Sequence, residues 1–159
     1  MFLKDFEIRW NDLDANRHLA NTSFFAFASN TRMAFLNSIG FGHAYLEKHQ
    51  IGPILFYEKM HYFKEFKPDE LVKVSLELAG LSEDGRFFEF YHNYYTATGV
   101  NKARGNVMGA WMDLKTRKLT PLKAEAMAFY DAVPKAENFR VLTPEDTRKE
   151  LQMPKDIEL

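Results

Sequence analysis

The chain opens with apolar and polar side chains that alternate with a period of two. Phe2, Phe6, Ile8 and Trp10 fall on one side, while Leu3 is the lone apolar residue among charged residues on the other. Alternation of this kind is typical of a strand with one buried face. We therefore predict an N-terminal strand whose apolar side faces a core.

The next long apolar stretch has the length of a helix. Between residues 24 and 39, apolar side chains occupy most sides of a helix, and Arg32 is the only charged residue. A surface helix carries charge along its outer face, so this segment predicts a core helix covered by other elements. One of the polar residues at 21–23 would cap its start, and Gly40 suits its end.

The pattern that follows predicts a sheet. We expect a second short helix over 43–49 and then four strands over 54–66, 71–81, 87–98 and 103–114. Turns that contain glycine separate the last three of these strands. One strand, a buried helix and four antiparallel strands make an α+β domain in which a curved sheet wraps a helix.

The chain has the size of a single domain. Its 159 residues, with 46% hydrophobic content, suffice for one sizeable core. We predict one domain over 1–159, with a core over about 2–122 and a C-terminal helical extension over 122–159. In that extension, residues 122–132 are expected to form an amphipathic closing helix, and 143–145 to begin a short last helix.

Composition excludes several kinds of chemistry. The chain has no cysteine and therefore no disulfide, thiolate nucleophile or Cys-ligated metal. No histidine spacing is typical of a metal site and no glycine pattern cradles a phosphate, so we expect neither metal nor cofactor. A net charge of −1 without a basic stripe gives no reason to expect a nucleic acid or a membrane as partner. The N-terminus lacks a secretory signal, which favours a cytoplasmic protein.

Candidate chemistry lies between the predicted first strand and the core helix. Asp14, Asn16 and His18 place an acid, an amide and an imidazole within five residues. A helix start offers unpaired backbone N–H groups that can hold a developing oxyanion. Asp14 would act as a base toward water, while Asn16 and His18 orient that water or a substrate carbonyl. The alternative is that Asp12 and Asp14 form turns and caps only.

The run from Trp10 to Asn21, with the Phe-rich segment after it, resembles the motif of hot-dog-fold thioesterases. It is most similar to the W-x-D-x-D-x-N-x-H-x-x-N form of acyl carrier protein thioesterases and 4-hydroxybenzoyl-CoA thioesterase-like proteins. Segments 60–71 and 113–122 resemble later parts of the same family, so the likeness covers about residues 2–122. The resemblance implies a hot-dog fold, in which a curved antiparallel sheet of about five strands wraps a long central helix.

The resemblance also implies an activity and a site. We expect hydrolysis of an acyl thioester of CoA or of an acyl carrier protein, with Asp14 either activating water or attacking the carbonyl itself. Glu65 ends a Tyr-x-x-Glu pattern that places a second carboxylate in the sites of the family. Hot-dog relatives build their sites at subunit interfaces, which implies a homodimer or a homotetramer. The length and type of the acyl group stay open.

Two other functions stay open at this point. Hot-dog hydratases and dehydratases resemble this chain in a D-x-N…H element, but their histidine usually lies one residue further from the acid than His18 lies from Asp14. A non-catalytic module that binds acyl-CoA is the other alternative. The joint presence of Asp14, Asn16 and His18 argues against it, because a binder needs no activated water.

Overall fold

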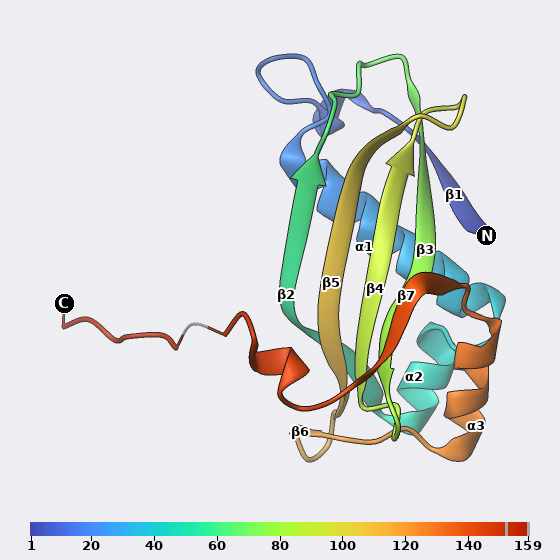
Figure 1. Ribbon diagram of the computed structural model, residues 1–159, viewed down its shortest axis with the longest axis vertical. Coiled ribbons are helices and arrows are strands. Elements are labelled where there is room, and N and C mark those ends of the chain that lie inside the picture. The colour runs from blue at the N-terminus through green and yellow to red at the C-terminus, as the bar shows by residue number, and fades with distance from the viewer. Residues whose placement is uncertain (152, 159) are drawn as a thin grey trace.

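Figure 1 shows a computed structural model of the protein, which describes residues 1–151 and 153–158. Five strands form a curved antiparallel sheet in the order β1-β3-β4-β5-β2, with β6 beside β5 and β7 beside β3. The strands are β1 (Phe2–Glu7), β2 (Ile51–Tyr62), β3 (Leu71–Ser82), β4 (Phe87–Tyr95), β5 (Asn101–Asp113), β6 (Lys118–Leu119) and β7 (Lys135–Leu142). The helices are α1 (Asn21–Ser38), α2 (His43–His49) and α3 (Ala124–Met127). The predicted α+β arrangement is confirmed, since α1 runs along one face of the curved sheet.

Helix α1 buries one side and exposes the other. Phe24, Phe27 and Phe35 are buried against the sheet, where the ring of Phe27 stacks on that of Phe6. Burying a side chain of this size stabilises a fold by about 1.5–3 kcal/mol. The opposite side, which carries small and amide side chains such as Asn30, is exposed. The expectation of a helix covered on most sides is therefore wrong for the single chain, because the sheet lies on one side only.

The first strand is shorter than its alternation predicts. β1 pairs with β3 and ends at Glu7, and Trp10 lies in a 3-10 turn (Trp10–Asp12) with 90% of its surface exposed. Asp12 causes the break, because its carboxylate accepts hydrogen bonds from the Arg9 N–H at 2.9 Å and from Arg9 Nε at 3.1 Å. The assignment of Trp10 to the buried side of a strand is wrong.

The second strand is displaced from its predicted range. β2 begins at Ile51, which pairs with Asp113 of β5, and it ends at Tyr62. Beyond that point the next two backbone N–H groups both turn to the Lys102 carbonyl, at 2.9 and 3.0 Å. The chain leaves the ladder there, so the predicted extension to residue 66 forms a loop instead.

The C-terminal part differs most from the predictions. The expected closing helix over 122–132 is divided into α3 and a 3-10 segment, Ala128–Ala132. β7 was not predicted, and it adds to the sheet parallel to β3. A further 3-10 turn, Asp146–Arg148, follows the predicted helix start. The helices in the described part of the chain are all too short or too polar to cross a membrane.

Candidate functional site

The loop that precedes α1 is closed by backbone hydrogen bonds around Asp14. Asp14 Oδ1 accepts the N–H of Asn16 at 2.8 Å and that of His18 at 3.0 Å. The Asp14 N–H donates to the His18 carbonyl at 2.9 Å, and Arg17 completes the turn with a left-handed φ of 61°. Asp14 Oδ1 thus holds the loop. Its Oδ2 has no hydrogen-bond donor among residues 1–151 and 153–158, so this exposed carboxylate keeps one oxygen available to a water.

Asp12 has the structural role that was considered for both aspartates. It is buried and bonded to Arg9, and the Ser23 hydroxyl donates to its backbone carbonyl at 3.2 Å. Burial alone would raise the pKa of Asp12, but the hydrogen bonds from Arg9 outweigh it and lower that pKa. Asp12 therefore ties the 3-10 turn to the first turn of α1, and the neighbouring loop is held in place.

The segment after β2 brings Glu65 to the loop. The Leu19 N–H donates to the Phe66 carbonyl at 3.0 Å, which joins the two segments. Glu65 is exposed there, and its own backbone N–H and then the nearby His18 lower the pKa of its carboxyl group. A carboxylate and an imidazole from distant parts of the sequence are thus near enough to interact electrostatically, although no hydrogen bond joins them within the described residues.

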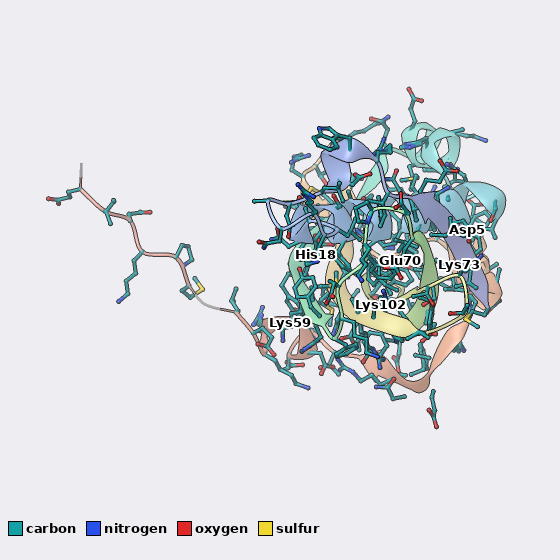
Figure 2. The ribbon with its side chains drawn as sticks, turned by 90° about the horizontal axis from the view of Figure 1, so that it is seen from above. Asp5, His18, Lys59, Glu70, Lys73 and Lys102 are labelled. Atoms are coloured by element: carbon teal, nitrogen blue, oxygen red, sulfur yellow. The ribbon has the colours of Figure 1, made fainter. Side chains whose placement is uncertain are left out.

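Lys102 of β5 fixes the same segment from below. Its Nζ donates to the Glu65 carbonyl at 2.9 Å and to the Glu70 carboxylate at 2.7 Å. Figure 2 looks onto this end of the molecule and shows His18 on its loop, with Glu70 and Lys102 beside each other. Because both charges of the Lys102–Glu70 pair are used in holding the segment, we assign the pair a structural role.

No side chain caps the start of α1. Ala20 is the N-cap residue, so the predicted cap from residues 21–23 is wrong, and Ser23 turns to Asp12 instead. The first N–H groups of a helix carry partial positive charge and point away from its end. An uncapped start, directly after the loop of Asp14, is able to hold an anion that forms during a reaction.

The four predicted site residues are not equally engaged. Asp14, Asn16 and His18 share one short loop, and Glu65 is near enough for His18 to lower the pKa of its carboxyl group. Asn16 contributes to the loop through its backbone N–H, and its side chain has no hydrogen-bond partner within the described residues. Asp14, Asn16 and Glu65 are all exposed in the single chain. One protomer alone therefore does not give them the dry surroundings that a reaction centre needs.

An apolar cavity of about 210 Å³ lies between α1 and the inner face of the sheet. Its wall includes Met33, Leu36, Leu55, Phe88, Phe90 and Trp111. No pattern in the sequence showed which residues would surround this cavity. Arg32 is the only charged residue of this wall, and its isolation in an apolar helix was the one signal in the sequence.

A family model described as the thioesterase-like superfamily matches residues 8–130. A putative oleoyl thioesterase from Lactobacillus plantarum has a similar structure (TM-score 0.77, 14% identity), with the match covering 99% of this chain and 56% of that one. A 1,4-dihydroxy-2-naphthoyl-CoA thioesterase from Synechocystis matches over 82% of this chain and 96% of its own, with a TM-score of 0.73 and 14% identity. A hypothetical protein from Staphylococcus aureus, solved in complex with CoA, matches over 96% of this chain and 95% of its own, with a TM-score of 0.73 and 16% identity. No curated protein matches the sequence.

Proposed function

The chain belongs to the thioesterase-like superfamily, and on this premise we propose that it hydrolyses acyl-CoA thioesters to a free acid and CoA. Asp14 activates the attacking water. The observation that carries the proposal is the Asp14 loop, in which two backbone N–H groups fix one carboxylate oxygen and leave the other unused. The exposed second oxygen lies in the same short loop as His18, directly before the uncapped start of α1, and this combination supports a role in catalysis.

The proposed reaction uses each group once. Asp14 Oδ2 takes a proton from a water while the water oxygen attacks the thioester carbonyl carbon. The N–H groups at the start of α1 bind the resulting oxyanion. The tetrahedral intermediate then collapses, the C–S bond breaks, and protonated Asp14 returns its proton to the CoA thiolate, which restores the carboxylate. His18 and Asn16 orient the water and the thioester, and Glu65 adds a second carboxylate near His18.

A second copy of the chain would supply the shielding that one protomer lacks. β2 is the last strand of the main sheet path, and its outer edge is unpaired within the described residues. Leu55 and Phe56 on this strand are 42% and 40% exposed, although both are large and apolar. Edge strands with exposed apolar side chains are prone to pair with another chain. We therefore propose a homodimer through β2, with the reaction site between protomers.

The acyl group is proposed to enter the apolar cavity beside α1. Part of the cavity wall is aromatic and is formed by Phe88, Phe90 and Trp111. These side chains offer no hydrogen bond to the interior of the cavity, because the Trp111 ring N–H donates to the Tyr130 hydroxyl. Apolar cavities of this kind accept hydrocarbon in place of water. The thioester end would remain outside, toward the polar residues.

A panel of acyl-CoAs tests the function directly. Aliphatic and aromatic CoA thioesters and matched acyl carrier protein thioesters are offered, and free thiol is measured. We expect turnover on at least one CoA series. Tight binding without thiol release would support a non-catalytic module, and loss of the enoyl-CoA absorbance without thiol release would support a hydratase. Either outcome contradicts the proposal.

A further inference from the structure

A polar cluster forms in the middle of α1, far along the helix from the Asp14 loop. Arg32 Nη1 lies 3.2 Å from His92 Nε2 of β4, and Arg32 Nη2 donates to Glu58 Oε1 of β2 at 3.4 Å. The Arg32 side chain is only 13% exposed. At 1.5 Å per residue, it lies about 16 Å from the start of the helix. The cluster is thus separate from the proposed hydrolytic residues.

The state of His92 follows from its surroundings. The residue is buried, and burial together with the charge of Arg32 lowers its pKa to about 3. At neutral pH the ring is therefore uncharged. Its Nδ1 lies 2.8 Å from the Ser75 carbonyl, which can only accept, so the proton sits on Nδ1. Nε2 then has a free lone pair and accepts from Arg32, which fixes the guanidinium.

The register of β2 places Glu58 on the inner face of the sheet, toward Arg32 of α1. A bulge between Leu55 and Tyr57 shifts the pairing with β5 by one residue. Glu58 consequently pairs with Val107, whose side chain is buried on the inner face. Bulges re-aim side chains in this way. Without it, Glu58 would be directed to the outer face, and Arg32 would have no counter-charge.

The guanidinium is not fully used by these contacts. An arginine offers five N–H donors, and two of them account for the contacts to His92 and Glu58. At 3.4 Å the contact to Glu58 is longer than the roughly 2.7–2.9 Å usual for charged pairs. Arg32 is also part of the wall of the apolar cavity, which includes one other residue with a hydroxyl group, Ser29.

We propose that Arg32 selects acyl groups that carry an uncharged oxygen, a hydroxyl or keto group, at the point where the chain passes the cavity wall. This inference rests on the proposed function and names its substrate class. An oxygen acceptor there would complete the bonding of a fixed guanidinium, whereas a plain hydrocarbon chain would leave its donors unpaired.

The charge of the cluster explains why the oxygen is uncharged. Arg32 and Glu58 together carry no net charge, and the neutral His92 adds none. A carboxylate on the acyl chain would bring a second negative charge next to Glu58. Like charges at close range repel each other. A hydroxyl or keto oxygen meets no such repulsion.

The test compares kcat/KM for a hydroxyacyl- or ketoacyl-CoA with that for the unsubstituted acyl-CoA of equal length, with the oxygen placed at successive carbons. For one position we expect a preference of about tenfold, the scale of one hydrogen bond to a charged donor. Arg32→Met should bring this ratio to about one. Arg104→Met is the matched control, since Arg104 packs on Tyr91 of the outer face, and it should keep the ratio.

A charge change sharpens the test. Glu58→Gln leaves an acceptor for Arg32 but makes the cluster cationic, so relative activity on ω-carboxyacyl-CoA should rise by about tenfold or more. No preference for any oxygenated chain, or an unchanged ratio in Arg32→Met, would overturn the inference. If the enzyme releases no thiol at all, the proposed function fails. In that case calorimetry measures the binding affinities for the oxygenated and the unsubstituted acyl-CoA. A preference for the oxygenated ligand that Arg32→Met removes supports the role of Arg32. If the wild type shows no such preference, the inference is overturned.

Discussion

The Asp14 loop and the Arg32 cluster handle charge in opposite ways. The loop is exposed, and its carboxylate is held by N–H groups that lie two and four residues away in the sequence. In the cluster His92 is buried, the Arg32 side chain is 13% exposed and Glu58 is exposed. Its members come from one helix and two strands, with separations of 26 and 60 residues. Local backbone fixes the first, and tertiary structure fixes the second.

The difference separates two tasks that one enzyme must perform. A water-activating carboxylate needs access to water and substrate, so a self-contained loop at the surface suits it once a partner covers it. A selective contact needs rigidity, which the bonds from Arg32 to two strands provide. Changes in the cluster should therefore alter stability and its pH dependence, while changes in the loop should alter turnover.

The largest expected stability effect comes from His92. Its pKa is about 3 in the folded chain and about 6.5 when unfolded, so the unfolded chain takes up the proton first. Above pH 6.5 His92 is uncharged in both states, so its protonation costs no stability. As the pH falls from 6.5 toward 3, the unfolded chain is protonated first and the free energy of unfolding decreases. We expect the Tm of the wild type to fall more steeply from pH 6.5 to 4 than that of His92→Gln. The control is His61→Gln, since His61 is exposed. Equal slopes of Tm against pH in the wild type and in His92→Gln would contradict the buried, uncharged state of His92.

Asp12 provides a smaller stability effect within the loop region. Asp12→Asn removes a buried charge bonded to Arg9 and should lower the free energy of unfolding by about 2 kcal/mol at pH 7. Because the folded pKa of Asp12 lies below its unfolded value, the difference should be constant above pH 4 and shrink below it. Denaturant unfolding at several pH values measures this. A difference that persists unchanged at pH 2 contradicts the assigned role.

Glu65 should show the smallest effect, and only on turnover. Its carboxylate is exposed and lies near His18, so Glu65→Gln should reduce kcat by about tenfold, below the usual loss of an acid-base group, with an unchanged Tm. Glu83→Gln, in the turn between β3 and β4, is the control. Wild-type turnover in Glu65→Gln would remove Glu65 from the site.

The parts of the molecule that local pattern determines were predictable. The Asp14 loop was found because its residues are contiguous, and β3 because Val72, Val74, Leu76 and Leu78 alternate with polar residues. The 43–49 helix was also predicted with its observed bounds. The end of β1 was missed because a side chain, Asp12, rather than the apolar pattern decides where the strand stops.

What distant partners determine was not predictable from one sequence. β7 has mixed polar and apolar residues, and it forms a strand because the edge of β3 accepts it. The Arg32 cluster depends on the bulge in β2, and no local sequence pattern predicted this bulge. A lone arginine in an apolar helix indicated that a partner must exist, but the identity of Glu58 and His92 required the fold.

The most direct test of the central claim is Asp14→Asn, compared with Asp113→Asn on the best acyl-CoA substrate. The control is closely matched, because Asp113 Oδ1 also accepts two backbone N–H groups, from Lys115 at 2.9 Å and Thr116 at 2.7 Å. Both variants should keep the wild-type Tm. We expect Asp14→Asn to lower kcat by at least about a hundredfold and Asp113→Asn to leave it unchanged. Equal thiol release by the wild type and Asp14→Asn would contradict the claim that Asp14 activates water.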